Sequence, residues 1–136
     1  MRILGIDYGD ARVGIALSDP LGWTARPLPH LSGSDTEELL QQLDRLVCEH
    51  GVEKIVLGFP KNMNGTVGPR GELTQAFGEK LRERTGLPVV LWDERLTTVS
   101  AAKIMNQTNV RGKKRKQQID SLSAVLILEN YLRSLS

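Results

Sequence analysis

Acidic residues at three separate points of the chain are the ones best suited to chemistry. The first, Asp7, ends the apolar run Ile3–Ile6, whose composition is typical of a buried strand. A carboxylate in that place is costly unless a cation or a hydrogen-bond donor compensates its charge. Gly5 and Gly9 leave room on both sides for backbone or ligand to approach. Asp7 is therefore a candidate site residue, although an aspartate that merely opens the turn at Tyr8–Ala11 would explain the same residues.

The second acidic group is the pair Asp93-Glu94, which follows the apolar run 89–92 and precedes Arg95. Successive side chains of a strand point to opposite faces of a sheet, so only one of the two carboxylates can face Asp7. The structural alternative is a pair of turn residues with an arginine partner, a common arrangement at the end of a strand.

The third acidic residue, Asp120, lies on an unexpected side of its predicted helix. In a helix over 117–134 it begins a stripe whose next members, at 124, 127, 128 and 131, are Ala, Ile, Leu and Tyr. A carboxylate near a helix N-terminus gains some tenths of a kcal/mol, which is the structural alternative. Because that benefit is available on any side of the helix, it does not explain the core-facing one, and a functional role is favoured.

Carboxylates from three remote segments, beside loops rich in Lys and Arg, are suited to Mg²⁺ or Mn²⁺. These cations prefer hard oxygen ligands and share the phosphate oxygens of a substrate. Two such ions about 4 Å apart can activate a water molecule and stabilise the leaving oxygen in phosphodiester cleavage. His30 and His50 have no partner at ligand spacing, so neither zinc hydrolysis nor a histidine-dependent triad is supported.

Basic residues are concentrated in one short segment. Five of the 18 Lys and Arg residues lie within 111–116, and the rest of the chain has 13 basic against 16 acidic residues. Such a density predicts a polyanion-binding segment that is solvated alone and orders on a phosphate backbone. The Gly-, Pro- and Asn-rich loop 60–71 adds Lys61, Asn62 and Arg70, which suit contacts with phosphate and sugar. Aromatic residues are few and mostly adjoin apolar runs, so we expect binding through phosphate contacts and shape rather than base stacking.

The order of predicted elements brings the acidic residues to one edge of a sheet. Strands over 2–7 and 12–18 form a hairpin, and further strands are predicted near 22–28 and over 54–58 and 88–92. Helices are predicted over 36–50, 70–85, 97–106 and 117–134. This order is typical of a mixed sheet covered by helices, whose ligands bind beyond the carboxyl ends of the parallel strands. Asp7, the loop 60–71 and Asp93-Glu94-Arg95 all follow such ends.

Length and composition predict one globular domain over residues 1–136. The hydrophobic fraction is 40% and the charged fraction 25%, which are ordinary values for a soluble protein. No apolar stretch approaches a membrane span, and the chain begins with a strand pattern rather than a signal peptide. We therefore expect a cytoplasmic location and no membrane partner. The single cysteine, Cys48, rules out a disulfide framework and is expected to be a small core residue.

Several segments together resemble the YqgF family, whose members are also called RuvX and are described as Holliday junction resolvases and as nucleases of pre-16S ribosomal RNA. The segments are Gly5-Ile-Asp-Tyr-Gly9, Gly58-Phe-Pro-Lys-Asn-Met-Asn-Gly65, Asp93-Glu-Arg-Leu-Thr-Thr98, Lys113-Lys-Arg-Lys116 and Ile119-Asp120 followed by Ala124-Val-Leu-Ile-Leu128. The resemblance covers essentially the whole chain. It departs modestly at Phe59 and Gly71, where Leu and Ala are frequent in the family.

The resemblance implies an RNase H-like α/β fold with a mixed five-stranded sheet and helices on both faces. It also implies a nuclease that acts on the 5′ end of pre-16S rRNA in a ribosome precursor, with branched DNA as an alternative substrate. From the chemistry of the carboxylates we expect it to depend on Mg²⁺ or Mn²⁺, with two ions favoured over one. The implied catalytic and metal-binding residues are Asp7, Glu94 (with Asp93 in reserve) and Asp120. The expected nucleic-acid contacts are Arg12, Lys61, Asn62, Arg70, Arg95, Lys113, Lys114, Arg115 and Lys116.

Two functions from other classes remain open on the residues alone. The run Gly-Ile-Asp-Tyr-Gly also resembles the first phosphate loop of actin- and sugar-kinase-like ATPases, which bind nucleotide between two lobes, whereas 136 residues supply one. A non-catalytic module that binds rRNA is the second alternative. The sequence does not distinguish a monomer from a homodimer.

Overall fold

A computed structural model of the protein describes residues 1–9, 11–60, 64–93 and 112–135, with the backbone only for 112–121. In this part of the chain five strands form one sheet in the order β3-β2-β1-β4-β5. Their bounds are β1 Ile3–Tyr8, β2 Arg12–Ser18, β3 Ala25–Ser32, β4 Lys54–Phe59 and β5 Val89–Asp93. The pairs β1–β2 and β2–β3 are antiparallel, and β1–β4 and β4–β5 are parallel.

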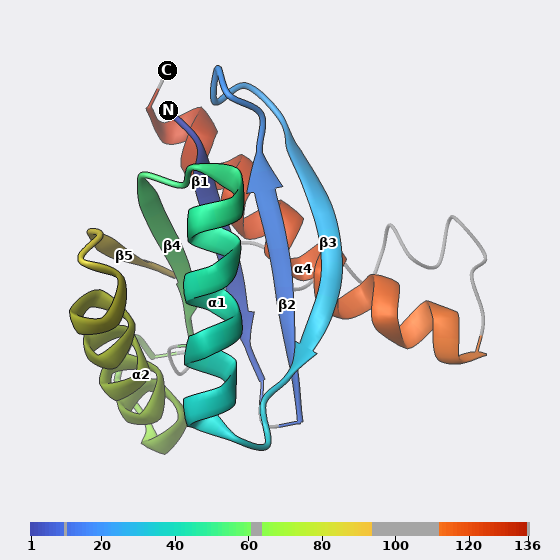
Figure 1. The fold of residues 1–136 in the computed structure, drawn as a ribbon. Helices are drawn as coiled ribbons and strands as arrows, with labels where there is room; N and C mark the ends of the chain where they lie inside the picture. The colour runs from blue at the N-terminus through green and yellow to red at the C-terminus, as the bar shows by residue number, and fades with distance from the viewer. Residues whose placement is uncertain (10, 61–63, 94–111, 136) are drawn as a thin grey trace.

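Helices cover both faces of this sheet. The helices α1 (Thr36–His50) and α2 (Pro69–Thr85) lie on one face, and α4 (Gly112–Ser134) crosses the other (Figure 1). The mixed five-stranded sheet with helices on both faces confirms the predicted α/β architecture. Among the described residues, none of the helices is both long enough and apolar enough to cross a membrane.

The alternation of side chains along β1 divides the core into two clusters. Leu4 and Ile6 are completely buried among residues of α1 and α2. Ile3 packs with the α4 residues Ala124 and Leu128 on the opposite face. Because successive strand residues alternate between faces, each residue of β1 can be assigned to the α1–α2 face or the α4 face.

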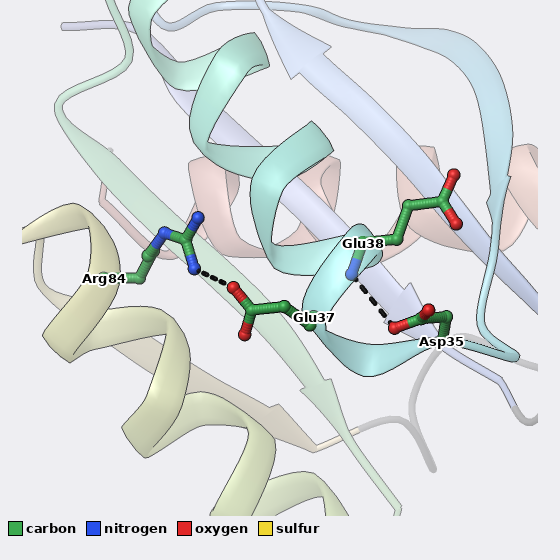
Figure 2. A network of polar contacts seen from close by, with 4 residues as sticks. All are labelled: Asp35, Glu37, Glu38 and Arg84. Carbon is green, nitrogen blue, oxygen red and sulfur yellow. Dashed lines mark hydrogen bonds and ion pairs between the residues drawn. The ribbon is translucent and has the colours of Figure 1, made fainter.

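The first two helices have the ends that their sequences predict, and a side-chain contact joins them. Asp35 caps α1 by accepting a hydrogen bond from the Glu38 amide (3.2 Å), and Gly51 ends it in the left-handed conformation. Arg84, near the end of α2, reaches back to Glu37 in the first turn of α1, at 2.6 Å (Figure 2). The two helices are thereby linked on one face of the sheet.

Three sequence predictions about elements and burial are wrong. The third strand spans Ala25–Ser32 rather than 22–28, because an edge strand tolerates Pro27 and Pro29, which lack an amide donor. The last helix begins at Gly112 rather than 117, so the basic run 113–116 is helical. Cys48 is exposed, because the buried stripe of α1 runs through Leu39, Leu43 and Val47 and position 48 lies beyond its edge. The helix predicted over 97–106 lies outside the described residues.

Candidate active site at the carboxyl edge of the sheet

The parallel strands β1, β4 and β5 end at the same edge of the sheet. Ile6 of β1 is in register with Leu57 of β4, and Phe59 of β4 is in register with Asp93 of β5. Asp7 therefore lies at the edge where β4 and β5 also end. In folds of this kind the carboxyl edge is where ligands bind.

Asp7 lies on the face that α4 covers. The preceding residue on that face, Gly5, is so close to α4 that a Cβ there would lie 2.9 Å from the Leu128 Cβ and 3.1 Å from the Ala124 carbonyl oxygen. The absence of a side chain at Gly5 thus brings the helix against the strand directly below Asp7.

The direction of α4 places residue 120 at the same level as Asp7. Near the start of the strands, the Lys54 ammonium donates a hydrogen bond to the Tyr131 hydroxyl at 3.0 Å, and Lys54 is in register with Ile3. Further along β1, Gly5 lies against Ala124, so α4 runs antiparallel to β1. Residue 120 is one turn before Ala124 on the same side of the helix, and Asp7 is two residues beyond Gly5. The side chain of Asp120 lies outside the described part.

The two members of the second acidic pair have different relations to Asp7. Trp92 packs with the α4 cluster, its ring meeting that of Tyr131 edge-on at 5.6 Å. Val89 packs with the α1–α2 cluster, and Asp93 follows the same alternation. Asp93 therefore lies on the face opposite Asp7, which weighs against Asp93 as the partner of Asp7. Glu94 and Arg95 lie outside the described residues.

Asp7 carries a half-buried carboxylate that forms no hydrogen bond or ion pair with any other described residue. The described residues contain no group of three acidic, His or Cys side chains able to hold a metal ion. Of the three predicted ligands, however, only Asp7 has a side chain that the structure describes. A carboxylate without a partner among the described residues, at a ligand-binding edge, has the chemistry that a hard divalent cation requires.

Two of the predicted basic contacts lie at this edge. Arg70, in the first turn of α2, donates a hydrogen bond from its guanidinium to the Tyr8 carbonyl oxygen, next to Asp7. Arg12 opens β2 beside Val13, which is in register with Tyr8. Lys61 and Asn62 lie outside the described residues.

Sequence reasoning missed the contribution of two aromatic residues to the site. Tyr8, interpreted as the start of a turn, stacks on Phe77 of α2 with ring centroids 4.2 Å apart and planes 4° apart. The Arg70 guanidinium lies 4.8 Å above the Tyr8 ring centroid. Because these contacts join segments more than sixty residues apart, no local pattern could have indicated them.

The basic run 113–116 forms the start of α4. Figure 1 shows these N-terminal turns extending beyond β3, away from the sheet. The first turn contains no acidic residue. Cations at the positive end of the helix dipole are unfavourable, so an anion bound there would stabilise the helix.

Comparison with known proteins is consistent with this geometry. Residues 1–134 match the family model described as "RuvX: Holliday junction resolvase". Proteins named "Putative pre-16S rRNA nuclease" from Desulforamulus reducens and Bacillus subtilis are 49% and 50% identical, over 98% and 100% of both chains.

The solved structure of Thermus thermophilus RuvC with a Holliday junction substrate has a TM-score of 0.65 at 13% identity, covering 100% of this chain and 97% of the other. A fowlpox virus resolvase complex has a TM-score of 0.61 at 12% identity and covers 99% of both chains. These likenesses confirm the RNase H-like fold.

Proposed function

Since the chain belongs to the RuvX family of Holliday junction resolvases, we propose that it is a nuclease that hydrolyses phosphodiester bonds at the carboxyl edge of its sheet. The single observation that carries this proposal is Asp7, a half-buried carboxylate without a partner among the described residues, at the edge where three parallel strands end. The family membership disfavours the ATPase interpretation of the same glycine-rich run.

Asp7, Glu94 and Asp120 would hold one or two Mg²⁺ or Mn²⁺ ions. Strand alternation supports Glu94 over its neighbour, because Asp93 lies on the opposite face from Asp7. The position of residue 120 one turn before Ala124 supports Asp120. Bound cations of this kind polarise a phosphoryl oxygen and activate water. The carboxylates would fix the position of the bound cations, whose positive charge would offset the repulsion between the carboxylates.

Basic residues around this edge would hold the phosphate backbone. The nucleic acid near the scissile bond would be contacted by Arg12, Lys61, Asn62, Arg70 and Arg95. Further from that bond, the projecting part of α4 would contact it through Lys113, Lys114, Arg115 and Lys116. Such contacts position a nucleic acid without reading its sequence, and they weaken as salt concentration rises.

The 5′ end of pre-16S rRNA, within a ribosome precursor in the cytoplasm, is the substrate we propose. Relatives that are about half identical over the whole chain are named "Putative pre-16S rRNA nuclease", which supports pre-16S rRNA as the polymer. The family description favours a second candidate, a four-way DNA junction.

Cleavage of labelled pre-16S rRNA and of a four-way DNA junction, each in Mg²⁺ and in EDTA, tests the proposal. We expect cleavage of the RNA in Mg²⁺ only. Asp7→Asn should lower the rate about a hundredfold or more, because several kcal/mol of transition-state stabilisation are removed, and should leave salt-sensitive binding in place.

The matched control is Asp44→Asn, which changes a partly buried aspartate of α1, outside the proposed site. It should cleave at the wild-type rate. Full activity of Asp7→Asn would overturn the site. Binding without cleavage by the wild type would identify a non-catalytic module, and cleavage of the junction alone would identify DNA as the substrate.

A further inference from the structure

We infer that Arg70 is a positioning residue, which fixes the end of β1 and thereby the carboxylate of Asp7. The inference rests on the proposed function, in which Asp7 is a metal ligand. Arg70 then has a role beyond the phosphate contact expected from its charge. Tyr8 and Phe77 take part in the same set of contacts that restrains β1.

The pairing of β1 with β4 stops just before the site. Its last pair is Ile6 with Leu57, so Asp7 and Tyr8 extend beyond the parallel ladder. On the other side β1 is still paired, since Asp7 is in register with Gly14 of β2. Beyond the end of the β1–β4 ladder, the Tyr8 carbonyl oxygen accepts a hydrogen bond from the Arg70 guanidinium, and this bond restrains the strand where its pairing with β4 has ended.

The ring of Tyr8 contributes a second contact with the Arg70 guanidinium. The Arg70 guanidinium lies 4.8 Å from the ring centroid, within the range of a cation–π interaction. The same ring stacks on Phe77, which is only 2% exposed. Arg70 and Phe77 are seven residues apart, two turns of α2, so one side of the helix holds both the ring and the carbonyl of Tyr8.

The first turn of α2 is itself firmly placed. The hydroxyl of Thr74, which is fully buried, donates to the Arg70 carbonyl oxygen at 2.9 Å. At Gly71 a Cβ would lie 3.0 Å from the Pro60 carbonyl oxygen, so the helix rests against the chain that leaves β4. Arg70 therefore connects the end of β4, through α2, to the end of β1.

This connection bears on metal binding because Tyr8 is one peptide unit from Asp7. Metal ligands must be held within about half an ångström of the productive geometry, and removal of a residue that orients a ligand lowers metal affinity about 10- to 100-fold. An arginine that only contacts phosphate would act on substrate affinity and on its salt dependence instead.

The test compares Arg70→Met, Arg70→Lys and the control Arg84→Met in the full-length protein. Arg84 is on the same helix, and its guanidinium binds Glu37 of α1, outside the site (Figure 2). Mn²⁺ affinity is measured by electron paramagnetic resonance without substrate, and amide hydrogen exchange is followed at residues 6–8.

For Arg70→Met we expect Mn²⁺ affinity without substrate to fall about tenfold or more, kcat to fall and the β1 amides to exchange faster. The lost phosphate contact should raise KM in addition. Arg70→Lys, which retains a donor, should recover part of the affinity. Arg84→Met should match the wild type in Mn²⁺ affinity and in exchange at residues 6–8.

Unchanged Mn²⁺ affinity and exchange in Arg70→Met, with a raised KM and a weaker salt dependence, would overturn the inference and leave Arg70 as a phosphate ligand. If Arg70→Met does not fold, Tyr8→Leu removes the ring but keeps the carbonyl, and faster exchange at residues 6–8 is again expected. A wild type that binds no Mn²⁺ would overturn the proposed function, whereas the exchange comparison would still decide whether Arg70 restrains β1.

Discussion

At the scale of single residues, Asp19 shows how a carboxylate can organise a turn. Between β2 and β3 its Oδ1 accepts hydrogen bonds from the amides of Trp23 (2.6 Å) and Thr24 (3.0 Å). The Thr24 hydrogen bond is the largest cause that lowers the pKa of Asp19 below its ordinary value of 3.8, and the Trp23 bond adds to it. The turn presents Trp23 with 80% of its surface exposed.

The turn should therefore loosen in acid. Because the folded-state pKa of Asp19 is lowered, its carboxylate stabilises the fold above pH 3.8, and this contribution disappears as the pH falls through the folded-state pKa. Asp19→Asn keeps an oxygen acceptor without a titrating charge. We expect the wild type to melt at a higher temperature near pH 7 and the two proteins to converge near about pH 2, as measured by melting curves across that range. A constant difference at all pH values would contradict this role.

At the scale of elements, the contact between β1 and α4 depends on one glycine. A methyl group at Gly5 would meet the Leu128 Cβ and the Ala124 carbonyl oxygen, neither of which belongs to a flexible side-chain end. Gly78, inside α2, offers a contrast, because its nearest neighbour is a terminal methyl group, the Leu57 Cδ2 at 3.3 Å, rather than a Cβ or a backbone atom. Two glycines buried against the same sheet thus differ in the space that they leave for an added methyl group.

We predict that Gly5→Ala destabilises the protein by about 1–3 kcal/mol, as overpacking generally does. Gly78→Ala should be neutral or slightly stabilising, because alanine gains up to about 1 kcal/mol of helix propensity over glycine. Urea unfolding of both variants measures the two effects. A Gly5→Ala variant as stable as the wild type would show that α4 can move away from β1.

The projecting start of α4 is the element expected to give binding its salt dependence. Replacing Lys113, Lys114, Arg115 and Lys116 together with Gln should weaken nucleic-acid binding. It should also reduce the slope of log affinity against log salt by up to about 3–4, at roughly 0.9 for each phosphate that the protein no longer neutralises.

Fluorescence anisotropy over a range of salt concentrations measures this slope. Helicity by circular dichroism should not fall, because the replaced charges oppose the helix dipole. A slope equal to that of the wild type would place the nucleic acid elsewhere on the protein.

At the scale of the whole molecule, one strand serves both halves of the core. Leu4 and Ile6 of β1 belong to the cluster under α1 and α2, whereas Ile3 belongs to the cluster under α4. If the helices on either face detached, β1 would lose half of its packing, and the cluster on the opposite face would be weakened. The two clusters should therefore unfold together.

Leu128→Ala tests this cooperativity. Its side chain is completely buried against β1, so its truncation should cost about 2–5 kcal/mol. We expect the fluorescence of Trp92, on the α4 face, and the circular dichroism of the whole chain to change in one coincident transition. Separate transitions for the two probes would mean that α4 unfolds on its own.

Features that depend only on neighbouring residues could be predicted from local sequence patterns. The hairpin, the capped ends of α1 and the positions of Asp7 and Asp93 at strand ends follow from turn, capping and alternation patterns that act over a few residues. The sequence motifs also indicated the family that the comparisons show. The start of α4 was less predictable, because a run of cations is equally compatible with a loop and with a helix.

The contacts between residues far apart in the chain follow from tertiary packing and could not be predicted from local patterns. The placement of Asp93 on the face opposite Asp7 depends on the register of β5 against β4, which local sequence does not contain. The bond between Arg70 and Tyr8 spans 62 positions and exists because α2 packs across the end of β1. Contacts of this kind depend on how whole elements pack, and so the composition of the site is set by the fold while the type of chemistry can already be predicted from its residues.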